Sequence, residues 1–185
     1  YDTYQINPLV IYPGINLTIK SRVSSGDYIL GYTRWQLAKN PWFFLQLAQR
    51  LPKRKFLVAG EWSNKLEELE FRNEIKDQHL ESQVYLQTKV TQKDLQKIAG
   101  RSFVWVHPHF EAFGMSGLEM AALGLPLIIP KGSGVTELFT DNREGFFPQS
   151  FKLEEISTLI KSIAANPNQA KRMGSMATIT AKKFT

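Results

Sequence analysis

The sequence contains no cysteine, no long hydrophobic run and no secretion signal. Without cysteine the chain can form no disulfide and use no thiolate chemistry. Its apolar stretches fall well short of the roughly 18 residues of a membrane-spanning helix. The first residues lack the basic and apolar regions that a signal peptide needs. These absences fit a cytoplasmic protein, and we expect one.

Three common nucleotide or nucleophile motifs are also missing. The sequence has no G-x4-G-K-[ST] loop, no G-x-G-x-x-G after an apolar strand and no G-x-S-x-G turn. These absences argue against a P-loop ATPase, a dehydrogenase and a serine hydrolase. The short turn that contains Gly132 and Gly134 leads towards Glu137, and its pattern fits either a second anion-binding nest or an ordinary turn.

The composition is that of a soluble globular domain with an excess of positive charge. The 185 residues are 43% hydrophobic and 22% charged, which allows a substantial core. The net charge of +6 favours an anionic partner such as a nucleotide, and it would also suit peripheral contact with the inner face of a membrane. Aromatic residues lie mostly inside apolar runs rather than on a stacking surface, so we expect no nucleic acid partner.

Apolar runs alternate with helical patterns along the chain. The candidate strands are residues 27–32, 55–59, 83–86, 103–107, 125–129 and 145–147. The candidate helices are residues 41–50, 65–77, 92–99, 116–123, 135–139, 153–165 and 169–182. Apolar strands separated by helices predict an α/β fold, a Rossmann-like parallel sheet of about six strands with helices on both faces. Ligands of such sheets bind at the carboxyl ends of the strands.

The domain organisation follows from the same pattern. Residues 1–20 have the composition of a linker, and residues 21–185 would form the domain. The last residues continue a helical pattern without a cap. We therefore expect the working protein to be longer than this chain.

The most informative segment is HPHFEAFGMSGLE, from His107 to Glu119. It predicts a strand, a glycine-containing loop and a helix N-terminus, with the carboxylates of Glu111 and Glu119 at its edges. A helix N-terminus favours phosphate, and carboxylates accept hydrogen bonds from sugar hydroxyls. The combination suggests a nucleotide-sugar ligand. A structural alternative is a capping box, in which Ser116 and Glu119 only stabilise the start of the helix.

Arg34 and Lys39 form a second candidate group. They follow the first predicted strand five residues apart, and a planar guanidinium with a mobile ammonium suits a diphosphate. They could also be two surface cations close to a helix start. Cations are unfavourable there unless an anion joins them, which favours the functional interpretation.

A possible metal motif, H-x-H-x-E, is formed by His107, His109 and Glu111. Two imidazoles and a carboxylate can bind zinc. However, Pro108 interrupts the strand, and no other histidine or cysteine lies near in the sequence. We therefore expect no metal, with His107 at a strand end and His109 facing the ligand.

At this point the sequence resembles a known family. The block EAFGMSGLEMAALGLPLI contains Glu111-x7-Glu119 and is followed by GSGVTE and NREGFF. Together they resemble the C-terminal half of the retaining GT-B glycosyltransferases of family 4. The segments VIYPGIN, FLVAGEW and QVYLQTKVTQKDL are similar to the family's linker, second strand and base-flanking loop. The resemblance covers nearly the whole chain.

The resemblance implies a role for each matching residue. Glu111 would lie beside the donor sugar, Glu119 would bind the ribose hydroxyls, and Arg34 with Lys39 would neutralise the leaving diphosphate. The remaining donor-binding residues implied by the resemblance, or placed in the site by the loop pattern, are Phe113, Gly114, Met115, Ser116, Val90, His109, Gly134 and Glu137.

The resemblance also implies a partner domain and an activity. The family usually needs no metal cofactor, and it transfers a hexose from a nucleoside diphosphate sugar to a glycan or lipid-linked acceptor. The N-terminal acceptor domain would be absent from this chain, so we expect it to bind donor but hardly turn over.

Two departures and two alternatives accompany the resemblance. Asn40 stands where the family often has glycine, and His109 stands where serine is common. One alternative is a sugar-nucleotide epimerase of GT-B fold. The other is a non-catalytic module that binds a nucleotide or glycan.

Overall fold

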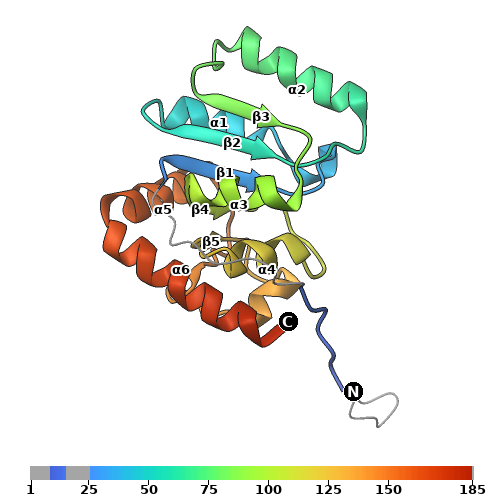
Figure 1. The fold of residues 1–185 in the computed structure, drawn as a ribbon. Coiled ribbons are helices and arrows are strands. Elements are labelled where there is room, and N and C mark those ends of the chain that lie inside the picture. Colours follow the sequence, from blue (N-terminus) through green and yellow to red (C-terminus); the bar gives the residue numbers. More distant parts are fainter. Residues whose placement is uncertain (1–8, 16–25, 185) are drawn as a thin grey trace.

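The computed structural model describes residues 9–15 and 26–184, which contain a six-stranded sheet (Figure 1). The strand order is β3-β2-β1-β4-β5-β6, and every neighbouring pair is parallel. The strands are β1 (Tyr28–Tyr32), β2 (Lys55–Ala59), β3 (Val84–Gln87), β4 (Ser102–Val106), β5 (Leu127–Ile128) and β6 (Gly145–Phe146). This sheet confirms the predicted Rossmann-like α/β fold.

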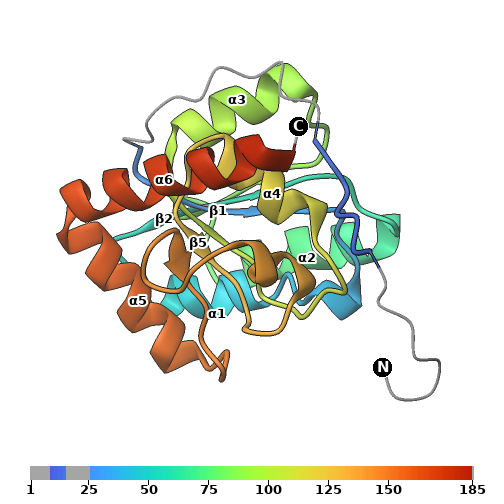
Figure 2. The same ribbon diagram turned by 90° about the horizontal axis from the view of Figure 1, so that it is seen from below.

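Helices cover both faces of the sheet (Figure 2). The α-helices are α1 (Phe43–Arg50), α2 (Lys65–Asp77), α3 (Gln92–Gly100), α4 (Met115–Ala122), α5 (Leu153–Ala165) and α6 (Pro167–Ala181). Three 3-10 helices accompany them, η1 (Leu37–Lys39), η2 (Gly134–Leu138) and η3 (Lys182–Phe184). Helices α1, α2 and α5 pack on one face, and α3, α4 and most of α6 pack on the other. The two apolar layers explain why the central strands are apolar on both sides.

Several element boundaries differ from the sequence expectation. The apolar run 125–129 pairs with its neighbours only over Leu127–Ile128, although the whole run is buried. The expected helix 135–139 is the 3-10 helix η2. Helix α6 begins at Pro167, two residues before the predicted start, because proline is well suited to the first position of a helix.

The most important topological feature is the junction between β1 and β4. These strands are neighbours, but the chain leaves β1 towards α1 on one face and leaves β4 towards α4 on the other. The two outgoing loops therefore separate, and a crevice opens at the carboxyl end of the sheet. Such switch points are the usual ligand sites of open α/β sheets.

Residues 9–15 run along the outside of the domain without forming a helix or strand. Ile15 is buried and donates its backbone N–H to the carbonyl oxygen of Phe184 at 2.8 Å. Tyr12 packs against the rings of Phe113 and Phe184. The rest of the expected linker, residues 1–8 and 16–20, lies outside the described residues. Across the described ranges, no helix has the length and apolar character needed to cross a bilayer.

Candidate donor site at the carboxyl end of the sheet

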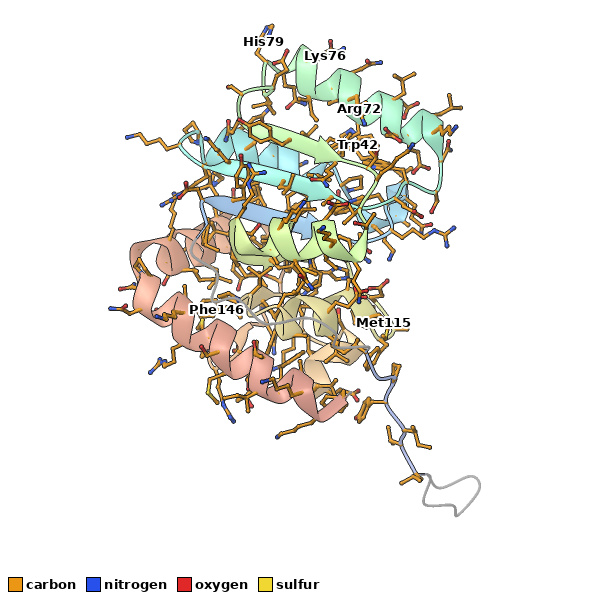
Figure 3. All side chains as sticks on the ribbon, in the orientation of Figure 1. Trp42, Arg72, Lys76, His79, Met115 and Phe146 are labelled. Atoms are coloured by element: carbon orange, nitrogen blue, oxygen red, sulfur yellow. The ribbon has the colours of Figure 1, made fainter. Side chains whose placement is uncertain are left out.

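A cavity of about 600 Å³ lies at the carboxyl end of the sheet, where the loops after β1, β2, β3 and β4 meet. Its lining combines two cations, three carboxylates and the start of α4. The lining residues are Tyr32, Thr33, Arg34, Lys39, Gly60, Glu61, Val90, Glu111, Phe113, Gly114, Met115, Ser116 and Glu119. The exposed Met115 marks the start of α4 in Figure 3. Among the described residues, this lining contains most of the side chains expected from the sequence.

The loop after β4 turns sharply into α4 at Gly114. Gly114 occupies the N-cap position with φ 94°, a conformation that glycine adopts without steric cost. Within residues 9–15 and 26–184 no side chain caps the helix, so the capping box proposed as an alternative for Ser116 and Glu119 does not form. The helix starts two residues too early for that pairing, since its N-cap is Gly114 rather than Ser116. The first amide groups of α4 therefore remain available to an anion.

Glu119 lies one turn into α4 and faces the cavity. In the described part of the chain its carboxylate has neither a hydrogen bond nor an ion pair. Burial raises the pKa of Glu119 above its usual value. The neighbouring Tyr32 has its pKa raised to about 12, first by burial and then by the negative charges of Glu119 and Glu61. Glu119 is thus a half-buried acceptor without a donor, as expected of a group that binds a ligand hydroxyl.

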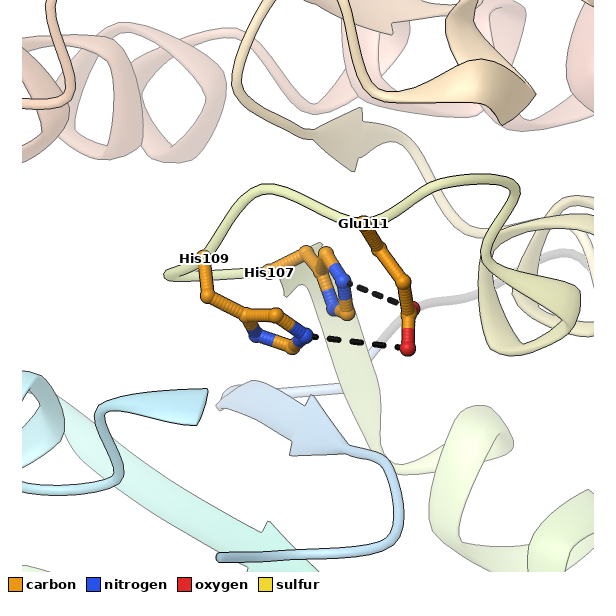
Figure 4. A group of neighbouring side chains, drawn as sticks. All are labelled: His107, His109 and Glu111. Atoms are coloured by element: carbon orange, nitrogen blue, oxygen red, sulfur yellow. Dashed lines mark ion pairs between the residues drawn. The ribbon is translucent and has the colours of Figure 1, made fainter. Parts of the chain in front are cut away.

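Glu111 is the most densely contacted carboxylate of the site (Figure 4). Lys39 donates to its Oε1 from a distance of 2.6 Å. The Nε2 of His107 lies 3.1 Å from Oε2, and the Nε2 of His109 lies 3.8 Å from Oε1. Two imidazoles and one ammonium therefore surround one carboxylate.

These neighbours fix the charge of the cluster. His107, followed by His109 and Lys39, holds the pKa of the Glu111 carboxyl well below its usual range, against the opposing effect of burial. Burial lowers the pKa of His107 to about 4, although the Glu111 carboxylate acts in the opposite direction. At neutral pH Glu111 is therefore anionic and His107 neutral.

The cation loop after β1 is anchored by Trp35. The Trp35 backbone N–H donates to the carbonyl of Glu61 at 2.7 Å, and its indole N–H donates to Ala59 at 2.8 Å. The ring is fully buried, so the loop is tied to the end of β2. Arg34, immediately before this anchor, is exposed at the cavity, and Lys39 reaches across to Glu111.

Asn40 ends the short helix η1 in a left-handed conformation with φ 53° and ψ 53°. Asparagine tolerates this conformation better than other residues with a side chain. The departure at Asn40, where the family often has glycine, therefore leaves the backbone path of the loop intact.

Two predicted residues lie behind the cavity rather than in its wall. Gly134 donates its N–H to the carbonyl of Glu111 at 3.1 Å, and a side chain at this position would collide with the carbonyl of Ala112. Glu137 accepts a hydrogen bond from the Tyr12 hydroxyl at 3.0 Å. Gly134 therefore supports the Glu111 loop, and Glu137 fastens the N-terminal segment to η2.

Most predicted site residues do meet in the cavity. Those in its lining are Arg34, Lys39, Val90, Glu111, Phe113, Gly114, Met115, Ser116 and Glu119. His109, expected to face the ligand, contacts Glu111 from behind instead. Sequence reasoning missed Tyr32, Thr33, Gly60 and Glu61. Their positions at the end of β1 or directly after β1 and β2 were the available signal.

His107, His109 and Glu111 also form a group that could hold a metal ion. One ligand atom from each lies within 4.8 Å of the others. The interruption at Pro108 was expected to keep the two imidazoles from acting together. In the structure the chain bends after β4, and the two rings pack against each other at an angle of 46° with centroids 3.9 Å apart.

The fold and its crevice define a Rossmann-like domain of the kind found in GT-B glycosyltransferases. The sequence profile described as "Glycosyl transferases group 1" matches residues 19–179. The chain belongs to this glycosyltransferase family. Among curated protein sequences no significant match is found.

Solved structures agree with this assignment. HepE from Anabaena, in complex with UDP, is 20% identical in sequence and superposes with a TM-score of 0.73. The match covers 88% of this chain and 45% of the HepE chain. Sucrose-phosphate synthase from Thermosynechococcus elongatus is 18% identical with a TM-score of 0.81. The match covers 93% of this chain and 47% of the synthase chain. The C-terminal domain of LpcC from Francisella tularensis is 16% identical with a TM-score of 0.71. The match covers 86% of this chain and 87% of the LpcC domain.

At these identities the similarity concerns the fold. The chain spans slightly less than half of HepE and of the synthase, and most of the isolated LpcC domain.

Proposed function

We propose that this domain binds the donor of a retaining glycosyltransferase, which moves a hexose from a nucleoside diphosphate sugar to a glycan or lipid-linked acceptor. The observation that carries the proposal is the shared cavity at the switch point. It places Arg34, Lys39 and the open N-terminus of α4 beside Glu111 and Glu119. Cations and helix amides suit a diphosphate, and the carboxylates suit sugar hydroxyls.

The parts of the donor can be assigned along the cavity. Glu119 would accept hydrogen bonds from the ribose, and Val90, in the loop after β3, would lie by the base. Arg34, Lys39 and the first amides of α4 would bind the diphosphate. Glu111, which precedes α4 in the loop after β4, would contact the transferred sugar. HepE has been seen with UDP and with UDP-glucose, which makes a uridine nucleotide the first donor to test.

The chemical contribution of this domain would be electrostatic. As the glycosidic bond breaks, negative charge develops on the diphosphate, and fixed cations stabilise it most at that stage. The same cations make a metal cofactor unnecessary in this proposal. The ammonium of Lys39 already bridges the Thr33 hydroxyl, at 3.0 Å, and Glu111. It is therefore held in place at the mouth of the sugar site before donor binds.

The acceptor would be bound by another domain of a longer protein. This chain spans about half the length of the first solved neighbours, so it would bind donor but turn over little alone. We place the whole enzyme in the cytoplasm, where its positive charge would permit contact with the inner face of a membrane. His109 and Gly134 would affect donor binding indirectly, through their contacts with Glu111. Glu137 would do so through Tyr12, which packs against Phe113.

The reaction can be tested with the full-length protein. Incubation with a UDP-hexose and acceptor, followed by ¹H NMR of the new anomeric centre, should show the donor's own configuration retained. An inverted product would refute the retaining mechanism. Interconversion of nucleotide sugars without acceptor would indicate an epimerase instead. Glu111→Ala should remove transfer, and an unchanged rate in that variant would support a non-catalytic binding module.

A further inference from the structure

The cluster behind the cavity contains buried polar atoms without partners. All four imidazole nitrogens of His107 and His109 are buried, and none has a hydrogen-bond partner among the described residues. The Nε2 of His107 is only 3.1 Å from Glu111, but it is not directed along a hydrogen bond. The His107 side chain is 1% exposed and that of His109 is 9% exposed. Unpaired buried polar groups are costly, and a ligand that bonded to these nitrogens would remove that cost.

The geometry of the cluster fits a transition-metal ion. Around a tetrahedral zinc ion with bonds near 2.1 Å, the donor atoms lie ~3.4 Å apart. Here the Nε2 of His107 lies 3.1 Å from one oxygen of Glu111 and the Nε2 of His109 lies 3.8 Å from the other, and a ligand atom from each residue lies within 4.8 Å of the others. Figure 4 shows both rings on the same side of the Glu111 carboxylate. Two imidazoles with one carboxylate are ligands that zinc prefers and that magnesium does not.

We propose that His107, His109 and Glu111 bind Zn²⁺ or a similar transition-metal ion, and that this ion inhibits the domain rather than serving its chemistry. The inhibitory part rests on the proposed function, because an ion on Glu111 withdraws that carboxylate from the sugar. The binding part depends only on the cluster. Lys39 opposes the ion, since its ammonium already occupies Oε1 at 2.6 Å and carries the same sign of charge.

Opposite effects of two substitutions test the binding. Calorimetric titration of this chain with ZnCl₂ should give a 1:1 site that His109→Gln weakens at least tenfold, as expected for loss of one ligand. Lys39→Met should strengthen it, because a competing cation is removed. His79→Gln is the matched control, since His79 is exposed and follows the end of α2 (Figure 3), and it is not among the residues grouped with Glu111. MgCl₂ should give no heat from this site.

A spectroscopic measurement identifies the ligands. Co²⁺ bound by two imidazoles and a carboxylate should give the visible absorption of a low-symmetry four- or five-coordinate site, and ZnCl₂ should abolish it. Absence of Zn²⁺ binding at micromolar concentrations would overturn the proposal. Equal affinity in the wild type and a folded His109→Gln variant would overturn it as well, because the ion would then sit elsewhere.

The inhibitory part is measured separately, on the full-length enzyme. Zn²⁺ at saturation should reduce sugar transfer at least tenfold, EDTA should restore it, and His109→Gln should be less sensitive. Unchanged transfer with the ion bound would refute inhibition and leave the metal site standing. A full-length protein that transfers no sugar, but whose domain binds Zn²⁺, would instead refute the proposed function.

Discussion

Substitution of Glu119 by glutamine separates a ligand-binding carboxylate from a structural one. Glu119 faces the cavity, has no partner among the described residues and pays a desolvation cost that raises its pKa. Glutamine keeps the size of the side chain and removes the charge. We therefore expect Glu119→Gln to leave the domain at least as stable as the wild type, while donor binding weakens.

The size of the affinity loss follows from the number of hydrogen bonds. A hydrogen bond to a charged group contributes about 1.5–3 kcal/mol. If ionised Glu119 accepts from the ribose, the variant should bind UDP about 10- to 150-fold more weakly, since 1.4 kcal/mol corresponds to a factor of ten. Isothermal titration calorimetry measures both dissociation constants directly. Glu70→Gln on the exposed face of α2 is the matched control and should leave UDP affinity unchanged.

The dependence of stability on pH provides a second readout. Because the pKa of Glu119 is raised in the folded state, the folded chain holds its proton at pH values where the unfolded chain has lost it. Stability from this group is therefore lost as pH rises from the ordinary glutamate pKa through the raised value. Glu119→Gln lacks this loss. The free energy of unfolding of Glu119→Gln, minus that of the wild type, should therefore increase as pH rises from the ordinary glutamate pKa through the raised one. Below the ordinary glutamate pKa this difference should not change with pH.

A capping role predicts the opposite stability change. Loss of a helix cap would cost about 1 kcal/mol, or a Tm lower by about 2–4 °C for a domain of this size. A Glu119→Gln variant that melts earlier but binds UDP normally would refute the functional interpretation. A variant that melts at the same or a higher temperature and binds UDP weakly would support it.

Further predictions concern the cation loop and one buried carboxylate. Asn40→Ala should lower the free energy of unfolding by about 1–2 kcal/mol, because residue 40 has a left-handed backbone conformation that glycine, but not alanine, adopts easily. Asn40→Gly should therefore cause no such loss. Urea titrations measure both variants, and equal losses would contradict the explanation. Glu144 is buried and accepts hydrogen bonds from the Thr140 N–H and the Thr180 hydroxyl. Glu144→Ala should therefore lower the free energy of unfolding by at least about 2 kcal/mol. The folded variant should bind UDP with unchanged affinity. Arg34→Ala should weaken UDP binding about tenfold in low salt and less in high salt; an effect independent of salt would argue against a charge contact.

The fold could be predicted because its signals are local and repeated. Apolar runs such as β2 and β4 alternate with helical patterns, and a parallel sheet is the arrangement that buries them on both faces. Boundaries were harder. The run around Leu127–Ile128 is as apolar as the other strands, but the regular strand covers only these two residues, although Pro126 and Ile129 also make backbone hydrogen bonds to neighbouring segments. Pairing is decided by neighbouring strands, which a local pattern does not contain.

The site could be predicted in part for a similar reason. Residues in the loops that leave the carboxyl ends of strands, such as Arg34 and Glu111, are brought to this edge of the sheet by the topology. The direction of a loop side chain is set by contacts that are distant in sequence. His109 was expected to face the ligand, but its ring packs at a tilt against His107 and lies close to Glu111. The capping box at Ser116 does not form because the N-cap is Gly114, whose positive φ starts the helix two residues earlier than that box requires.

The central claim is that the cavity at the switch point binds a nucleoside diphosphate through Arg34 and Lys39. The most direct measurement is a calorimetric titration of this chain with UDP, GDP and ADP, using wild type and the double variant Arg34→Ala/Lys39→Ala. A second double variant, Arg50→Ala/Lys53→Ala, removes the same charge from exposed positions away from the cavity. We predict that at least one diphosphate binds to the wild type and to the control, and at least 100-fold more weakly to the cavity variant. Equal binding to all three proteins, or no binding of any diphosphate to the wild type at millimolar concentration, would contradict the account.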